Sequence, residues 1–217
     1  MSGSAPTRFP RGSSRTAIPR GILAGTAMIA VLTLSACHHS VSADTQALDH
    51  SGMAYDSVKE LRALDVTNLE ITQILKIYGS GFSEQDSVAI VHIFHSRGQA
   101  FTGGDAVSDL LQAGVRDDTI LGLARLNQLG AYAGEFEAMH LAGLSDPIIL
   151  EVARHRSEGR PVLSGASLAG LKNTGLHSST LLVLARRGVP DADAKAIISL
   201  RRRGASDAQI LHHFSGS

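Results

Sequence analysis

One local pattern recurs along this chain and constrains its fold more than any other feature. An apolar residue is followed four positions later by a residue suited to positive φ, usually glycine, and then at once by a second apolar residue. Helices commonly end with glycine just beyond the last turn, and the next apolar residue folds back onto that turn. Each copy therefore predicts a helix end, and we call its central residue a joint. The joints are Asp65, Gly81, Gly114, Gly143, Gly175, Gly188 and Gly204.

Each joint also predicts the start of the next helix. Asp, Asn and Ser side chains accept hydrogen bonds from the free N–H groups at a helix start. Such a residue stands three positions after six of the joints, and at the seventh place, Glu84, the preceding Ser83 can take the role. We expect these residues to cap the helices that follow. They are Asn68, Asp117, Asp146, Ser178, Asp191 and Asp207.

The spacing of the joints predicts the architecture. Gly114, Gly143, Gly175 and Gly204 are separated by 29, 32 and 29 residues. A unit of about 30 residues with two short helices has the size of a helical-hairpin repeat. The only strand-like run, 88–94, has flanks that favour a buried helix. We therefore predict an all-α fold, an array of about ten short helices in helical-hairpin repeats of roughly 30 residues.

The N-terminal region has the composition of an export signal. Residues 1–36 contain four arginines and no acidic residue, and residues 21–34 are apolar or small throughout. This run is shorter than the roughly 20 apolar residues that a membrane-spanning helix needs. It ends at Cys37, the only cysteine of the chain. The stretch Leu34-Ser35-Ala36-Cys37 resembles the lipobox of bacterial lipoproteins. A plain secretory signal with an incidental cysteine is the alternative.

The resemblance implies that the chain is cut before Cys37, that the thiol receives a diacylglyceryl group and that the new amine is acylated. Residues 1–36 would then be the signal peptide, 37–45 a lipidated tether and 46–217 the helical-repeat domain. The chain would be held in the cell envelope through the lipid at Cys37. Because His38 rather than Asp follows the cysteine, the resemblance to Gram-negative lipoproteins implies the periplasmic face of the outer membrane.

Charge is distributed unevenly along the chain. Removal of residues 1–36 takes away four of the 20 Lys and Arg residues and none of the 20 acidic ones, which leaves a net charge of −4. This balance disfavours a general nucleic-acid-binding surface. The C-terminal region is nevertheless basic. Its arginines can complement helix dipoles, or they can form a face that binds an anionic partner. The candidates are Arg186, Arg187, Arg201, Arg202 and Arg203.

Residues 81–126 and 188–204 resemble the helix-hairpin-helix motif, as found in membrane-anchored DNA receptors of bacterial competence. Shared features include Gly81, Ile90, Gly98, Gly114 and Ile120. That motif binds phosphate through a glycine two residues after its first glycine. In this chain residues other than glycine occupy that position, so we expect the helix-hairpin-helix scaffold without its nucleic-acid chemistry. They are Ser83, Arg116, Ser145, His177, Pro190 and Ser206.

No arrangement of residues predicts catalysis, a cofactor or a metal. His92 and His95 are three residues apart, close enough on a helix to share an ion, but no further ligand stands at a suitable spacing. The scarcity of aromatic residues, 4% of the chain, disfavours a large ligand cavity with aromatic walls. We expect a non-enzymatic, membrane-anchored interaction module with an envelope protein as its partner. The alternative is an envelope-anchored DNA-binding receptor of helix-hairpin-helix type.

Overall fold

The computed structural model describes residues 45–215, and this part of the chain is all-α, with no strand. It lies within a single compact unit, Val41–Ser217. The predicted signal peptide, Cys37 and most of the predicted tether lie outside the described residues. The helices are α1 (Gln46–Asp49), α2 (Tyr55–Ala63), α3 (Asn68–Gly79), α4 (Glu84–His95), α5 (Gly104–Gln112), α6 (Asp117–Arg125), α7 (Leu129–Leu141), α8 (Asp146–Ser157), α9 (Gly165–Asn173), α10 (Ser178–Arg186), α11 (Ala194–Arg202) and α12 (Asp207–His213), with a 3₁₀ turn at Asp191–Asp193.

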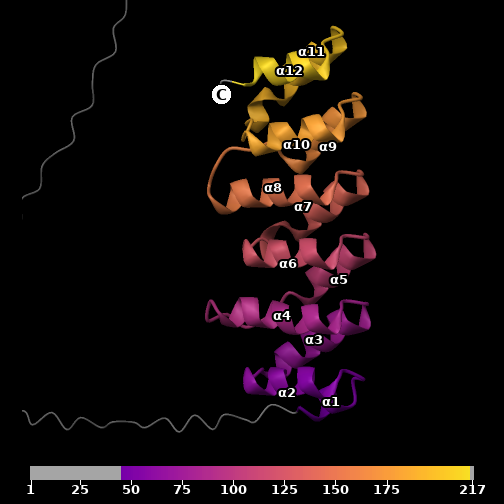
Figure 1. Cartoon of the computed structure of the whole chain (residues 1–217), viewed down its shortest axis with the longest axis vertical. Helices are drawn as coiled ribbons and strands as arrows, with labels where there is room; N and C mark the ends of the chain where they lie inside the picture. Colours follow the sequence, from indigo (N-terminus) through magenta and orange to yellow (C-terminus); the bar gives the residue numbers. More distant parts are fainter. Residues whose placement is uncertain (1–44, 216–217) are drawn as a thin grey trace, which may run out of the picture. The chain divides into compact units, whose positions relative to one another are not determined.

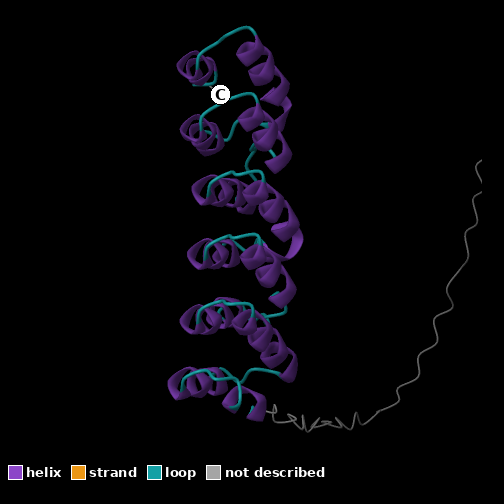
Figure 2. Cartoon of the chain, turned by 90° about the vertical axis from the view of Figure 1, so that its right-hand side faces the viewer, coloured by secondary structure: helices purple, strands orange, loops and turns teal. Residues whose placement is uncertain are grey.

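The helices form six hairpins, α1–α2 to α11–α12, stacked one on the next (Figure 1). Each helix packs mainly against the helices two before and two after it, so the odd-numbered helices form one column and the even-numbered helices another (Figure 2). The prediction of an all-α array of helical hairpins is confirmed. The described part of the chain has twelve α-helices, where about ten were predicted.

All seven predicted joints have positive φ, including Asp65 at 54°. At Gly81 and Gly114 the next residue donates its N–H to the apolar residue four before the joint: Phe82 N to Ile77 O at 3.1 Å, and Val115 N to Leu110 O at 2.9 Å. This bond pattern is the Schellman motif. Further helix-ending residues with positive φ were missed, mostly because a polar residue follows them. They are Gly52, Gly98, Asn127 and Gly159.

Neighbouring odd-numbered helices run in the same direction with their joints side by side. Lys172, three residues before its own joint, donates to the carbonyl of Gly143, the preceding joint. Arg201 holds the same position in α11 and donates to the carbonyl of Gly175 at 2.8 Å. Residues that stand the same number of positions before their joints therefore lie side by side on successive odd-numbered helices.

The predicted cap Ser83 is confirmed, and the other six predicted caps are wrong by one residue. The capping residue lies two positions after the joint, as in Ser83, whose side chain accepts from Asp86 N. Thr67 and Ser206 form complete capping boxes at α3 and α12. The residues expected to cap are instead the first residues of the helices or of the 3₁₀ turn. They are Asn68, Asp117, Asp146, Ser178, Asp191 and Asp207.

Acids in the first turn of a helix accept hydrogen bonds from a neighbouring hairpin. The N–H of Ala54 donates to Glu84 Oε1 at 2.9 Å, and the N–H of His177 donates to Asp207 Oδ2 at 3.1 Å. A carboxylate of one hairpin thus satisfies a free helix-start amide of the hairpin before it.

The odd-numbered column uses the opposite arrangement. Gly104 N donates to Gln73 Oε1 at 2.9 Å, and Gly165 N donates to Glu135 Oε1 at 2.7 Å. Here the acceptor belongs to the preceding hairpin. Adjacent hairpins are therefore joined by polar bonds as well as by apolar packing.

The buried apolar side chains form one continuous cluster from Leu48 to Phe214. The residues four before each joint are fully or almost fully buried except Leu200 in α11, which no further hairpin covers within the described residues. Burying a side chain of this size contributes about 1.5–3 kcal/mol. The unit therefore has a continuous hydrophobic core of its own, as a domain that folds by itself requires.

Candidate functional site

The outward face of the odd-numbered column is formed by residues nine, five and two positions before each joint. We call the part of this face on α5, α7, α9 and α11 the odd-helix surface. Its residues are exposed, except Gly170, which is half-buried. The residues are Asp105, Asp109 and Gln112 on α5, Gly134, Ala138 and Leu141 on α7, Ala166, Gly170 and Asn173 on α9, and Lys195, Ser199 and Arg202 on α11.

Charge changes sign along the odd-helix surface. Its α5 end has two carboxylates, Asp105 and Asp109, and its α11 end has the cations Lys195 and Arg202. Its α7 and α9 positions carry no charge, and the half-buried Glu137 is the nearest acid on α7 to this outward face. The middle of the surface therefore carries uncharged and mostly small residues, and it lies between an acidic end and a basic end.

Leu141 is the large apolar side chain in this uncharged region. It is 68% exposed at the end of α7. Surface helices normally present polar residues to water, whereas residues 129–141 contain no lysine or arginine. An exposed, uncharged helix face of this kind is typical of a contact surface.

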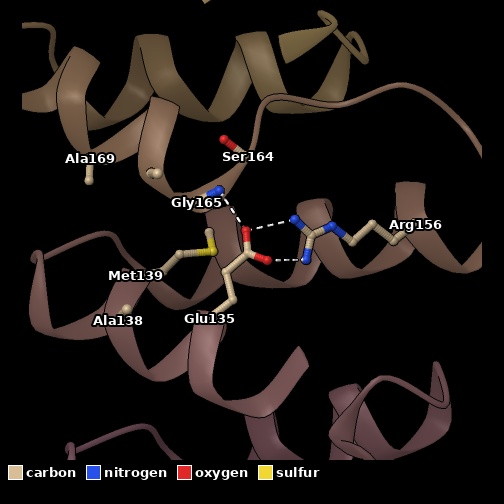
Figure 3. Close-up of a pocket in the computed structure, with 8 residues that line it drawn as sticks. Glu135, Ala138, Met139, Arg156, Ser164, Gly165 and Ala169 are labelled. Atoms are coloured by element: carbon tan, nitrogen blue, oxygen red, sulfur yellow. Dashed lines mark hydrogen bonds and ion pairs between the residues drawn. The ribbon is translucent and has the colours of Figure 1, made fainter. Parts of the chain in front are cut away.

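A trough of about 370 Å³ lies between α7 and α9, beside this uncharged region (Figure 3). Ala138 and Met139 line it from α7, and Ala166 and Ala169 line it from α9. At one end lie Glu135 and Arg156, which close the trough with an ion pair. Its walls are therefore mainly apolar, with a polar end.

That ion pair is bidentate. Arg156 Nη1 donates to Glu135 Oε2 and Nη2 to Oε1, both at 2.6 Å. The guanidinium also lies over the ring of Tyr132, 4.7 Å from its centroid. The hydrogen bond from Arg156 lowers the pKa of Glu135 against the effect of burial, and the bond from Gly165 N lowers it further. The pair fixes the polar end of the trough rather than offering a free charge.

The trough lacks the polar bridges that join α3 to α5. At the corresponding positions of α3 and α5, Lys76 pairs with Asp105, and Ser80 Oγ donates to Ser108 Oγ at 3.0 Å. Between α7 and α9 all four positions hold alanine. Ala138 and Ala166 stand in the places of Lys76 and Asp105. Ala142 and Ala169 stand in the places of Ser80 and Ser108.

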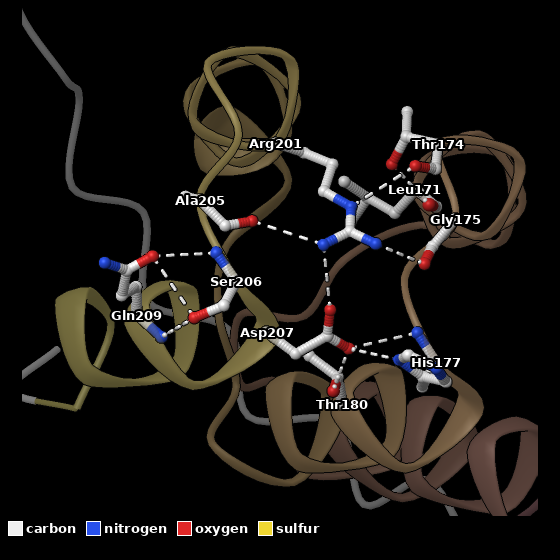
Figure 4. A network of polar contacts seen from close by, with 10 residues as sticks. All are labelled: Leu171, Thr174, Gly175, His177, Thr180, Arg201, Ala205, Ser206, Asp207 and Gln209. Atoms are coloured by element: carbon white, nitrogen blue, oxygen red, sulfur yellow. Dashed lines mark hydrogen bonds and ion pairs between the residues drawn. The ribbon is translucent and has the colours of Figure 1, made fainter.

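Arg201, a predicted site residue, is part of the scaffold. It donates to the carbonyls of Gly175 at 2.8 Å and Ala205 at 3.2 Å, and it pairs with Asp207 at 3.2 Å (Figure 4). Asp207 also accepts from Thr180 Oγ1 at 2.6 Å. Burial raises the pKa of Asp207, but the hydrogen bonds from Thr180 and His177 lower it more.

The structure does not bring the five predicted arginines together. Arg186 pairs with Glu151 at 3.3 Å, and Arg187 donates to the carbonyl of Leu211. Both lie at the C-terminal end of α10, whereas the side chain of Arg201, from α11, lies near the N-terminal end of α10. The two ends are about 13 Å apart along the helix. Arg202 and Arg203 are exposed, and their side chains have no ion pair or hydrogen bond within the described part of the chain.

The two histidines three residues apart have separate partners. His92 Nε2 lies 2.7 Å from Glu60 Oε1, and His95 Nε2 lies 2.6 Å from Glu70 Oε1. Within residues 45–215 no group of three His, Cys, Asp or Glu side chains is placed to hold a metal ion. The helices of that same region are all too short or too polar to cross a bilayer.

Sequence reasoning missed the odd-helix surface. The signal was the lack of lysine and arginine in residues 129–141, which becomes informative only when the outward face of the helix is known.

Comparison with known proteins found no family model, no characterised protein and no solved structure that matches this chain.

Proposed function

We propose that this chain is a lipid-anchored, non-catalytic interaction module of the bacterial cell envelope. The observation that carries the proposal is the uncharged middle of the odd-helix surface, where Leu141 is exposed beside an open trough. Stacked helical hairpins bind partners through their extended faces. The resemblance of Leu34-Ser35-Ala36-Cys37 to a lipobox supports attachment to the membrane.

The same geometry weakens the case for DNA binding. Arg187 and Arg201 are bonded to backbone carbonyls, and Arg186 is paired with Glu151. The positions where a helix-hairpin-helix turn needs glycine are the capping positions of this fold, and Ser83 and Ser206 occupy two of them. We therefore propose protein binding and not DNA binding.

Photo-crosslinking in the native envelope tests the function. A photoreactive amino acid at position 138 lies in the odd-helix surface, and one at position 125, an exposed arginine of α6, gives the matched control on the other column. We expect a discrete crosslinked protein at 138, its loss with Leu141→Glu, and no equivalent product at 125.

Equal labelling at the two positions, or no product at 138, would contradict the proposed function. Binding of the purified unit to duplex DNA, weakening steeply with salt, would favour the alternative receptor.

A further inference from the structure

We propose that the odd-helix surface binds an amphipathic helix of another protein, which lies across α5, α7, α9 and α11 with its acidic N-terminal end over α11. The proposal rests on the proposed function, because it names the kind of partner that this surface takes. The features that carry it are the apolar trough, the small residues around the trough and the opposite charges at the two ends of the surface.

The middle of the odd-helix surface favours a helical partner over an extended one. Among its six residues on α7 and α9, Asn173 has the only polar side chain. Buried backbone N–H and C=O groups need hydrogen-bond partners. An extended segment would find almost none here, whereas a helix bonds its backbone groups internally. Small side chains at the contact also let two helix axes approach closely. The small residues are Gly134, Ala138, Ala166 and Gly170.

The trough gives such a helix a central anchor point. Ala138 lines it from α7 and Ala166 lines it from α9. Leu141 lies one turn beyond Ala138 along α7 and is 68% exposed. Burying a large apolar side chain of the partner in the trough, beside Leu141, removes apolar surface of both chains from water. We therefore expect an apolar anchor such as leucine in the middle of the partner helix.

The charges at the two ends show that the partner crosses the helices of the stack. α5 packs beside α7, and α11 packs beside α9, so each lies one helix beyond the trough. Asp109 on α5 and Lys195 and Arg202 on α11 are exposed, and their side chains make no ion pair or hydrogen bond within residues 45–215. A helix that ran along the trough would leave these charges uncovered, whereas a helix that crosses the stack reaches both ends.

The helix dipole sets the direction of the partner. Acidic residues are favourable in the first turn of a helix and basic residues in its last turn. A helix with its charges in this order matches the surface when its N-terminal turn lies over the cations of α11 and its C-terminal turn lies over the carboxylates of α5. The charge order that fits the surface therefore also stabilises the partner helix itself.

The spacing of the stack sets the length of the partner. The axes of packed helices lie about 8–10 Å apart, so the distance from α5 to α11 is about 24–30 Å. A helix rises about 1.5 Å per residue and needs about 16–20 residues to cover that distance. Because the trough lies halfway, the apolar anchor should stand about 8–10 residues from each charged end.

Fluorescence anisotropy with the purified full chain tests the proposal. The probe is a labelled synthetic helix of about 24 residues. It has glutamates at its N-terminal end, one leucine in the middle of an alanine-rich sequence and lysines at its C-terminal end. We expect a dissociation constant of about 10–100 µM at low salt. The affinity should be highest when about 9 residues separate the leucine from each charged end, and it should fall at about 5 and about 13.

Charge variants of the chain assign the ends of the contact. Lys195→Glu with Arg202→Glu should raise the dissociation constant at least about tenfold, because both free cations of α11 are reversed. Asp109→Lys should raise it about threefold, because it reverses a single exposed carboxylate. Arg125→Glu, on the other column, is the matched control and should leave the dissociation constant unchanged. Circular dichroism verifies that each variant is folded.

A trough variant assigns the centre of the contact. Ala138→Lys with Ala166→Asp should raise the dissociation constant about tenfold or more, because it fills the space that the leucine of the probe enters. The substitution copies the Lys76–Asp105 bridge, which the fold already accepts between α3 and α5. Replacing the leucine of the probe by alanine should weaken binding to the parent chain but hardly change binding to this variant.

The absence of binding up to about 500 µM would overturn the proposal, as would binding that the charge and trough variants leave unchanged. Equal binding of a probe whose helix is broken by central prolines would show an extended partner and would also overturn it. Self-association of the chain that the trough variant abolishes would assign the surface to a second copy instead.

The two proposals fail in different ways. A chain that crosslinks an envelope protein at position 138 but does not bind the probe contradicts the helical partner and keeps the interaction module. A chain that neither crosslinks nor binds the probe contradicts both.

Discussion

Gly188, the joint after α10, lies where a side chain has no room. Its φ is +68°, and a Cβ built there would lie 2.8 Å from His155 Cε1 and 3.0 Å from the carbonyl oxygen of Pro161. His155 is 2% exposed, and its Nε2 lies 3.2 Å from the carbonyl oxygen of Arg186. The histidine cannot move aside without losing this contact. Gly188→Ala therefore combines backbone strain with overpacking.

The two contributions can be separated by a matched glycine. Positive φ at a non-glycine residue costs about 1–2 kcal/mol, and overpacking costs about 1–3 kcal/mol. Gly159 has nearly the same φ, +65°, but a Cβ there has nothing within 4 Å. We expect Gly159→Ala to lower the free energy of unfolding by about 1–2 kcal/mol and Gly188→Ala to lower it by about 2–5 kcal/mol.

Urea unfolding followed by circular dichroism measures both values. His155→Ala gives an additional check, because removing the ring should erase most of the difference between the two glycine variants in a double-mutant cycle. Equal destabilisation by Gly159→Ala and Gly188→Ala would refute the reasoning. The contact with His155 would then not limit the fold, and only the backbone conformation would matter.

Two further predictions concern acid stability and the membrane anchor. The pKa of Asp207 is below its ordinary value of 3.8, so its contribution to stability is present above that pH and is lost as the pH falls through the folded-state pKa. Asp207→Asn should therefore lose less unfolding free energy than the parent chain between about pH 6 and about pH 3 in urea titrations, and an equal loss would contradict this role. At the N-terminus, intact-mass analysis of the membrane fraction should find an acylated chain beginning at Cys37, and Cys37→Ser should release it, because each buried CH₂ contributes about 0.8 kcal/mol. A mature chain with another first residue, or without acyl mass, would contradict the lipobox prediction.

The joints were predictable because they are local. Positive φ, an apolar residue folding back and a helix end are all set within a few residues, and even Asp65 fits the rule with φ 54°. The capping residue was misplaced by one position because the acid after it looked like the better acceptor. Asp117 and Asp207 accept from residues of a neighbouring hairpin, and no local pattern shows which hairpin an acid will face.

The candidate site was much less predictable than the fold. Runs of arginine suggested a basic face, but the fold uses Arg201 as a backbone clamp and separates it from Arg186 and Arg187 by the length of α10. The odd-helix surface depends on residues about 30 positions apart being brought to the same height. Single residues such as Ala138 and Ala166 carry no signal until their equivalents, Lys76 and Asp105, are seen to form a bridge.

The bonds between hairpins limit how this array can change in length during evolution. Deleting α7 and α8 as one unit would leave the spacing of the joints acceptable, yet it would place α9 directly on α5. The buried N–H of Gly165 would then meet Ala106, the residue of α5 that corresponds to Glu135, and lose its acceptor. An unsatisfied buried amide costs about 1–3 kcal/mol. Loss of the α7–α8 hairpin is therefore best tolerated together with a polar substitution of Ala106 that restores an acceptor for Gly165.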